Sequence, residues 1–569
     1  MPKLATEDSS EARTLIDDLL TEQRTMTAVA KFSRLHERHE FPAQAKYYRD
    51  LIPLERAQTG QQYAFAVDLD ACTGCKACVT ACHNLNGLDD EETWREVGVL
   101  FGGTTLEPVQ QTVTTACHHC VDPACMNGCP VLAYEKDEVT GIVRHLDDQC
   151  IGCQYCILKC PYDVPKYSKK RGIVRKCDMC SSRLAVGEAP ACVQSCPNEA
   201  IRIEVVNKAE IVAEARQGIF LPDSPDPAYT QPTTRYRTTK TFPANMTGGD
   251  HFRVKPEHAH PALVVMLVLT QLSVGAFCAE MILRVLYATE VIAQFTPFHS
   301  LVALGLGLLA IGASTLHLGR PLYAWRAFVG LRTSWLSREI IVFSAFAGLA
   351  SLYAGMFWLP FLAKLSGVTI LRELAPPLVQ RAIGIFVAFS GVVGIACSAM
   401  IYQDTRRKLW TGARTFLRFF GSAALLGLAA TLFTTTAQAV FTPGISSNTA
   451  FASITAQLSA ALIAVTLAKI GFELMVFTHL RDVKFSLLKR SALLLSGELA
   501  EATSVRALTG AAGGIALPFY LLFSRPAPGA ATVGVTAWIL VFALLGELTE
   551  RYLFFTAVVP PKMPGGMAA

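Results

Sequence analysis

Charge is scarce in this chain. Asp, Glu, Lys and Arg make up 17% of its 569 residues, whereas hydrophobic residues reach 51%, a high share for a soluble protein. The net charge of +5 is too small to indicate a nucleic-acid partner. Residues 1–60 contain neither the apolar core of a signal peptide nor a twin arginine, so we expect no export of this chain.

Cysteine is nearly absent outside one segment, because 16 of the 18 cysteines lie between Cys72 and Cys196. The other two, Cys278 and Cys397, lie in apolar runs and are predicted to be packing residues. The sixteen fall into four groups: Cys72, Cys75, Cys78, Cys82; Cys117, Cys120, Cys125, Cys129; Cys150, Cys153, Cys156, Cys160; and Cys177, Cys180, Cys192, Cys196. The first and third groups have the C-x2-C-x2-C-x3-C spacing of bacterial ferredoxins, and the other two widen its middle gap.

This spacing predicts four [4Fe–4S] clusters, because sixteen thiolates supply four ligands to each cluster. Disulfides are disfavoured, since cytosolic thiols stay reduced. Zinc is disfavoured because its sites use well-separated C-x2-C pairs. Proline also follows the last cysteine in three of the groups, at Pro130, Pro161 and Pro197.

Four regions are expected along the chain. They are an N-terminal helical extension (1–62), an α+β ferredoxin-like domain with four clusters (63–205), an extended linker (206–256) and an all-α transmembrane anchor (257–569). The anchor contains eight apolar stretches long enough to span a bilayer. They run at about 261–285, 299–317, 339–362, 381–402, 418–440, 451–477, 507–524 and 532–556.

The loops between these spans differ in basic charge. Sixteen Lys and Arg residues lie on the side of the ferredoxin domain, and five lie on the opposite side. The positive-inside rule therefore places the ferredoxin domain in the cytoplasm, on a multi-pass protein of the bacterial inner membrane.

Ionisable residues in or near the spans are candidate functional residues. His317 lies at the cytoplasmic end of the second span and could exchange a proton with a quinone near neutral pH, or could cap the helix. Arg338 and Glu339 open the third span on the same side, where they could bind a ligand or anchor the helix.

Two further pairs of charges have helical spacing. Each pair is spaced i, i+4 and is predicted to form an ion pair: Glu280 with Arg284, and Lys469 with Glu473. Histidine is rare here, since only His260, His299, His317 and His479 lie in or near spans, all at predicted span ends. Bis-histidine haem needs facing histidines at similar depth, so we expect no haem.

The cysteine region resembles the four-cluster iron–sulfur subunit of the dimethyl sulfoxide reductase family of molybdenum enzymes. The resemblance covers about residues 63–240 and rests on Cys72-Thr73-Gly74-Cys75-Lys76-Ala77-Cys78, on the widened second and fourth groups, and on His83 after the first group. It implies four ligand sets: Cys72, Cys75, Cys78, Cys196; Cys82, Cys177, Cys180, Cys192; Cys117, Cys120, Cys125, Cys160; and Cys129, Cys150, Cys153, Cys156.

The membrane region resembles the eight-span, quinol-oxidising anchor subunit of that family. The matching residues are His317-Leu318-Gly319-Arg320-Pro321, Trp335-Leu336-Ser337-Arg338-Glu339, and Gly546-Glu547 with Arg551-Tyr552-Leu553-Phe554. The resemblance places the quinol-site histidine at His317. This chain differs in joining two usually separate subunits and in facing the cytoplasm, as the membrane-bound sulfite-oxidising enzymes do.

These observations predict an electron-transfer and membrane-anchor subunit of an oxidoreductase without catalytic residues of its own. Electrons would pass between a separate molybdopterin-containing catalytic subunit and membrane quinone, bound by His317, Arg320, Arg338 and Glu339. One alternative is an ion-translocating redox complex that uses the two ion pairs as a relay, although no span carries several unpaired charges at mid-depth. A redox-sensing transporter is another, although the spans show no paired broken helices.

Overall fold

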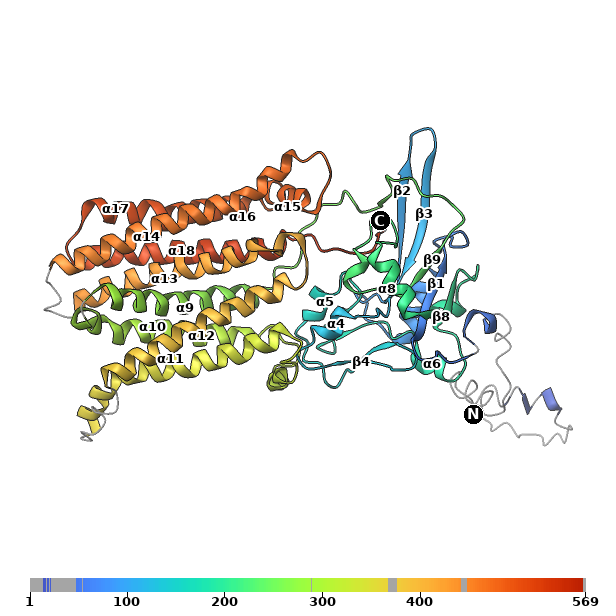
Figure 1. The fold of residues 1–569 in the computed structure, drawn as a ribbon, viewed down its shortest axis with the longest axis horizontal. Helices are drawn as coiled ribbons and strands as arrows, with labels where there is room; N and C mark the ends of the chain where they lie inside the picture. The colour runs from blue at the N-terminus through green and yellow to red at the C-terminus, as the bar shows by residue number, and fades with distance from the viewer. Residues whose placement is uncertain are drawn as a thin grey trace, which may run out of the picture.

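The computed structural model describes residues 14–16, 18–19, 21, 48–53, 55–287, 289–366, 376–441 and 448–565. A cluster domain with small sheets (residues 55–256) lies at one end of a bundle of long helices (residues 261–556), as Figure 1 shows. The expected fold class, a sheet-containing ferredoxin-like domain followed by a helical membrane region, is confirmed. The predicted N-terminal extension lies largely outside the described residues.

The cluster domain is built on two three-stranded sheets and two short hairpins. In the first sheet, β1 (Gln61–Asp68) pairs antiparallel with β8 (Ile201–Asn207) and parallel with β9 (Arg235–Arg237). The six central residues of β1 are buried, so this strand forms the core of the domain. The remaining strands are β10 (Thr247–Gly248), β2 (Glu96–Gly103) and β3 (Pro108–Thr115) in the second sheet, and β4 (Tyr134–Lys136), β5 (Val143–His145), β6 (Lys166–Ser168) and β7 (Ile173–Arg175) in the hairpins.

Short helices follow or carry the cysteines, and one turn precedes β1. They are η2 (Arg49–Leu51), α3 (Ala77–Asn86), α4 (Ala124–Asn127), α5 (Tyr155–Lys159), α6 (Ser181–Ala185) and α7 (Ala191–Gln194).

The expected linker, residues 206–256, belongs instead to the cluster domain. It forms α8 (Lys208–Arg216) and η3 (Pro227–Tyr229), and its strands β9 and β10 complete the two larger sheets. The side chain of Asn207 caps α8 by accepting a 2.9 Å hydrogen bond from the Ala209 N–H. The prediction was wrong because strands of two or three residues leave no alternating apolar pattern in a Pro- and Thr-rich sequence.

Eight described helices are long and apolar enough to cross a membrane. The bundle helices are α9 (Pro261–Leu286), α10 (Thr289–Thr315), α11 (Trp335–Ser366), α12 (Pro377–Gln403), α13 (Ala413–Phe441), α14 (Asn448–Leu474), α16 (Ala500–Ala511), α17 (Leu517–Ser524) and α18 (Ala530–Thr556). Between them lie η4 (Pro321–Phe328), η6 (Lys408–Trp410), η7 (Met475–Arg481) and α15 (Leu487–Ser496), while η8 (Ala512–Ala516) joins α16 to α17 as one span.

Helix α9 lies inside the bundle and packs against α10, α12, α13 and α18. A Cβ at Gly275 would overlap the carbonyl of Ala423, so this glycine permits close packing of α9 on α13. The second span begins at Val291, eight residues earlier than predicted, because Pro297 is accommodated inside α10. His299 is therefore inside a span, where its ring is hydrogen-bonded to Thr434 Oγ1 (2.7 Å) and the Ala276 carbonyl (3.1 Å).

Residues 557–565, which we call the C-terminal strap, run from the end of α18 back to the cluster domain. The Val99 N–H of β2 donates a 3.2 Å hydrogen bond to the Gly565 carbonyl, and Lys562 forms an ion pair with Asp250. Figure 1 shows the chain running back from α18 to the side of β2. The cluster domain is thus connected to the bundle twice, by the chain that leads into α9 and by the C-terminal strap that follows α18.

Candidate functional site

Left-handed backbone turns shape the cysteine loops. Gly74 and Gly152, each directly before the second cysteine of its group, have φ values of +74° and +71°. Two residues later, Lys76 and Gln154 have φ values of +61° and +60°, and each is the N-cap of the helix carrying the next cysteine. Glycine adopts such a conformation without steric cost, so the C-x-G-C spacing folds the loop back on itself.

Within the fold, the first cysteine group lies near the fourth and the second near the third. Burial raises the pKa of Cys82 to about 12, and the nearby Cys192 thiolate adds to the rise. Burial likewise raises the pKa of Cys125, and Cys160 adds to it. Cys129 has its pKa raised by burial to about 11, with Cys150 acting in the same direction. These neighbours support the group pairing that the resemblance implies.

A small cavity of about 20 Å³ lies among four of the cysteines. Its cysteines are Cys117, Cys120, Cys125 and Cys160, the third ligand set that the resemblance implies. Among the described residues, no three Cys, His, Asp or Glu side chains converge on a point that could hold a single metal ion.

Main-chain N–H groups point at several of the sulfur atoms. Ala133 donates to Cys129 Sγ (3.2 Å), Gly152 to Cys150 Sγ (3.4 Å) and Ala200 to Cys196 Sγ (3.3 Å). Such hydrogen bonds stabilise thiolates and help to set the reduction potential of a cluster.

A second cavity of about 210 Å³ lies where the cluster domain meets the bundle. Cys153 and Tyr155 line it from the cluster domain, while His317, Glu339 and Tyr402 line it from the bundle. The rest of its wall is mostly apolar and comes mainly from α9, α10, η4, α11 and α12, with Ile151 and Leu158 added by the cluster domain. This composition, apolar with a few convergent polar groups, is typical of a small-molecule site.

His317 lies in the turn after α10 with one ring nitrogen engaged. Its Nδ1 is hydrogen-bonded to the Ser314 carbonyl, and because a carbonyl only accepts, Nδ1 carries the proton. The Nε2 atom is then an unprotonated acceptor. Burial lowers the pKa of His317, which keeps the ring neutral near pH 7. Glu339, buried on α11, accepts a hydrogen bond from the Ser398 hydroxyl of α12.

The other two predicted quinone-site residues, Arg320 and Arg338, do not line this cavity. Arg320 donates from Nη1 to the Asp147 carbonyl (2.9 Å), and its backbone N–H donates to the Ile151 carbonyl (3.0 Å). Arg338 donates to the carbonyls of Leu331 and Arg332, and its guanidinium lies 4.3 Å from the centre of the Trp335 ring. Arg320 therefore joins the two parts of the protein, and Arg338 stabilises the turn before α11.

The chain segments around Arg320 and Arg338 pack the cysteine loops of the cluster domain against the bundle. A Cβ at Gly319 would overlap the carbonyl of Gly172, so the chain there requires glycine. Ser334 donates to the Gly128 carbonyl (2.8 Å) and Ser337 to the Pro130 carbonyl, on either side of Cys129. The sequence analysis did not predict these contacts, because a short motif does not indicate which distant residues it will contact in the fold.

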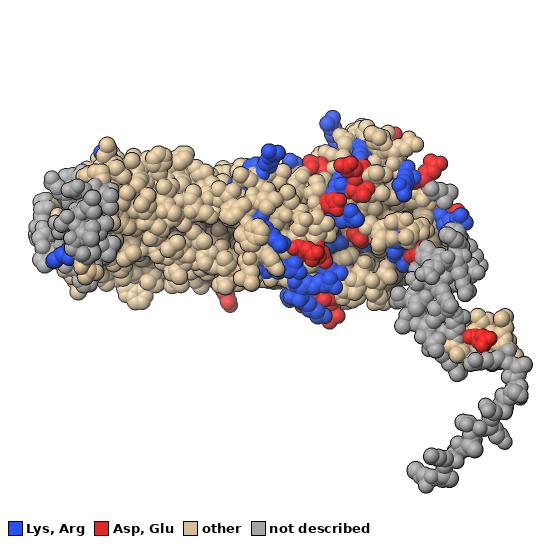
Figure 2. All heavy atoms as spheres, turned by 90° about the horizontal axis from the view of Figure 1, so that it is seen from below, with Lys and Arg blue, Asp and Glu red and all other residues tan. Residues whose placement is uncertain are grey.

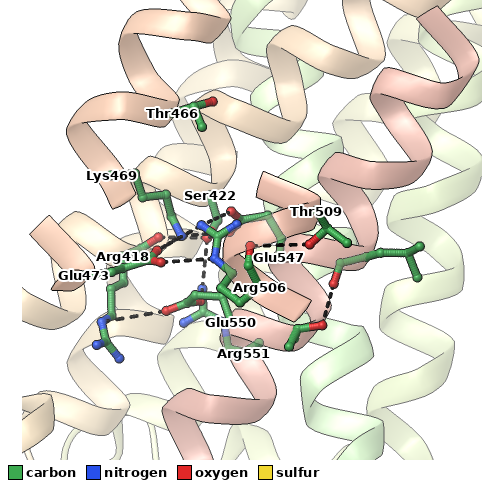
Figure 3. Close-up of polar contacts among 12 residues, drawn as sticks. Arg418, Ser422, Thr466, Lys469, Glu473, Arg506, Thr509, Glu547, Glu550 and Arg551 are labelled. Atoms are coloured by element: carbon green, nitrogen blue, oxygen red, sulfur yellow. Dashed lines mark hydrogen bonds and ion pairs between the residues drawn. The ribbon is translucent and has the colours of Figure 1, made fainter. Parts of the chain in front are cut away.

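A separate network of buried charges lies among α13, α14, α16 and α18 (Figure 3). Lys469 and Arg506 each contact both Glu473 and Glu547, at N–O distances between 2.5 and 3.0 Å. Glu550 lies 3.7 Å from Arg418 and 3.4 Å from Arg551. The predicted Lys469–Glu473 pair is thus present but belongs to a larger network, and the predicted Glu280–Arg284 pair forms at 3.0 Å. Every carboxylate in this network has a cationic partner.

Family models match both parts of the chain. The 4Fe-4S dicluster domain matches residues 109–206, and the DMSO reductase anchor subunit (DmsC) matches residues 257–556. The chain is 40% identical over 148 residues to the probable anaerobic dimethyl sulfoxide reductase chain YnfG of Escherichia coli, which covers 25% of this chain and 72% of that protein.

Two further relatives share the cysteine region. Hydrogenase-2 operon protein HybA of Escherichia coli O157:H7 is 34% identical over 201 residues, covering 31% of this chain and 60% of that protein. The formate dehydrogenase iron-sulfur subunit of Haemophilus influenzae is 33% identical over 184 residues, covering 29% of this chain and 59% of that protein. The chain belongs to the dimethyl sulfoxide reductase family, in which it unites the iron–sulfur electron-transfer subunit and the membrane anchor subunit.

Proposed function

We propose that the cavity between Cys153 and His317 binds a membrane quinone and that this chain exchanges electrons with it. The observation that carries the proposal is that one cavity is lined both by a predicted cluster ligand and by the predicted quinone-site histidine. The sixteen cysteines would hold four [4Fe–4S] clusters in the pairing given above. When bound, these clusters accept and release single electrons.

The cavity's own residues suit a quinone. Its wall is mostly apolar, as an isoprenoid quinone requires, while Nε2 of His317 can accept a hydrogen bond from a quinol hydroxyl. Glu339 supplies a second polar group in the same wall. Beside the cavity, η4 exposes Leu322, Trp325 and Phe328, residues typical of a membrane interface. A quinone could therefore enter from the lipid with its tail among apolar side chains.

The proposal also includes a separate catalytic subunit and a cluster domain that faces the cytoplasm. A separate catalytic subunit is implied by the family, and we propose that it carries molybdopterin and docks on the cluster domain. Figure 2 shows Lys and Arg side chains gathered where the bundle meets the cluster domain, whereas most of the visible bundle surface carries neither charge. This distribution supports a cytoplasmic cluster domain in the inner membrane.

The test compares His317→Ala with a control, His479→Ala, at another histidine near a span end. The purified full-length chain is titrated with a fluorescent hydroxyquinoline-N-oxide quinol analogue, and its clusters are monitored by electron paramagnetic resonance. We expect His317→Ala to lose probe binding and quinol-driven cluster reduction with all cluster signals intact, and His479→Ala to behave as wild type. Wild-type binding and reduction in His317→Ala would show that the quinone site lies elsewhere.

A further inference from the structure

Lys176 is buried between two of the cysteine ligand sets. It follows β7 and directly precedes Cys177, a member of the second ligand set. Its side chain lines the small cavity among the cysteines of the third ligand set, and only 2% of the residue is exposed. Lys176 thus borders the third set in space while its neighbour along the chain belongs to the second.

Three acceptors surround the amino group of Lys176. Its Nζ donates to Cys117 Sγ (3.6 Å), to the Cys177 carbonyl (2.8 Å) and to the Val143 carbonyl. These contacts use all three hydrogens of an ammonium group, whereas a neutral amine has only two, so the side chain carries a positive charge. Of the three acceptors, only the cysteine sulfur can carry a negative charge.

The charge of Lys176 is balanced differently from that of two other buried cations of the cluster domain. Lys159 lies 2.7 Å from Asp404, and Arg175 lies 3.1 Å from Glu92. Among the described residues, Lys176 has the sulfur of Cys117 in place of such a carboxylate. Because an unpaired buried cation is strongly unfavourable, Lys176 requires negative charge on the cysteine ligands and on the cluster that they would hold.

We propose that Lys176 sets the reduction potential of the cluster held by the third ligand set. This inference rests on the proposed cluster sets and is independent of the quinone site. Reduction adds one electron, and therefore one negative charge, to the cluster. A buried ammonium hydrogen-bonded to a ligand sulfur stabilises this added charge, since neither solvent nor salt screens the attraction strongly. The third cluster therefore holds an electron more tightly than it would beside a neutral side chain.

The effect is directed at one side of the junction between the two sets. Lys176 binds a sulfur of the third set but only a main-chain carbonyl of the second, at Cys177. The third cluster should therefore gain more from the positive charge than the second. Lys176 is thus a positioning residue, which acts through the cluster on the electron that passes between the two sets.

The experiment measures the potential of each cluster in the full-length chain. The clusters are titrated with dithionite and redox mediators, without quinone, and are followed by electron paramagnetic resonance. Cys117→Ser and Cys125→Ser identify the signal of the third set. Lys176→Met removes the charge, and Lys176→Gln removes it but keeps a hydrogen-bond donor. The matched control is Lys170→Met, which removes the same charge from the turn between β6 and β7, where the side chain is 76% exposed.

We expect both Lys176 variants to lower the reduction equilibrium constant of the third cluster at least tenfold, which corresponds to about 59 mV for a one-electron couple. All cluster signals should remain, and the second cluster should shift less. Lys170→Met should leave every potential unchanged, because solvent and salt screen an exposed charge. A wild-type potential of the third cluster in both Lys176 variants would overturn the proposal. An equal shift of all clusters would also overturn it, since that result indicates a general change in structure.

A second measurement needs no substitution of Lys176. In wild-type protein that contains nitrogen-15-labelled lysine, pulsed electron paramagnetic resonance of the reduced third cluster should show a coupling to a lysine nitrogen, because Nζ contacts a ligand sulfur. If the Lys176 variants fail to assemble their clusters, this coupling still decides, and its absence would overturn the proposal. Alteration of two different signals by Cys117→Ser and Cys125→Ser would instead show that the third ligand set is wrong. That result would remove the basis of the inference and leave the quinone site standing.

Discussion

The backbone N–H of Arg320 donates a 3.0 Å hydrogen bond to the carbonyl of Ile151, which directly follows Cys150. Three residues before Arg320, His317 lines the membrane cavity, and two residues after Ile151, Cys153 lines it from the opposite part of the protein. This main-chain contact therefore helps to hold a cysteine loop and the turn of the proposed quinone site against each other.

Gly319→Ala is predicted to disturb this contact. Its new methyl group would overlap the Gly172 carbonyl, and overpacking of this kind costs about 1–3 kcal/mol. We expect a lower thermal unfolding temperature and slower quinol-driven cluster reduction. Gly312→Ala on α10 is the control, because nothing lies within 4 Å of its added Cβ. Equal behaviour of the two variants would show that the close approach does not matter.

Cys196→Ser is predicted to alter the same cluster as Cys72→Ser, because the first and fourth groups share two clusters in the proposed pairing. Cys192→Ser and Cys82→Ser should each alter the other of these two clusters, in keeping with the electrostatic contact between Cys82 and Cys192. Electron paramagnetic resonance of the reduced protein distinguishes the signals, and Cys278→Ser serves as the unaffected control. Matching spectra for Cys196→Ser and Cys82→Ser would contradict the pairing.

Glu547→Gln is predicted to destabilise the bundle. The substitution leaves Lys469 and Arg506 with less negative charge inside the protein, and breaking a buried ion pair typically costs about 3–5 kcal/mol. Thermal unfolding in detergent should show the loss, while the exposed Glu501→Gln on α16 should not. The double variant Glu547→Gln, Lys469→Met should recover part of it. A Glu547→Gln protein as stable as wild type would refute a structural role for the network.

Fusions to green fluorescent protein report the membrane orientation, because this protein folds in the cytoplasm but does not fold when it is exported as an unfolded chain. A fusion after residue 569 should fluoresce, because the C-terminal strap lies on the side of the cluster domain. A fusion to a chain truncated after Arg525, in the loop between α17 and α18, should stay dark. The reverse pattern would place the cluster domain outside the cytoplasm.

Much of this architecture follows from local sequence signals. Cysteine spacing predicted the iron–sulfur region, and long apolar runs predicted the membrane helices, because both signals lie within one segment of chain. The placement of Arg320 and Arg338 could not be predicted, since it depends on carbonyls of Asp147 and Leu331 that no local pattern selects. The wider ion network was missed for the same reason, as Arg506 and Glu547 come from different helices.

The C-terminal strap has a consequence for electron tunnelling. A domain tethered at one point can pivot, and tunnelling rates fall steeply as the gap between donor and acceptor widens. Here the chain enters the bundle after Asp250 and returns to the same aspartate through Lys562 and the N–H of Gly565. The protein is thereby closed into a ring at Asp250, and this closure would limit changes in the gap between the proposed cluster and quinone sites.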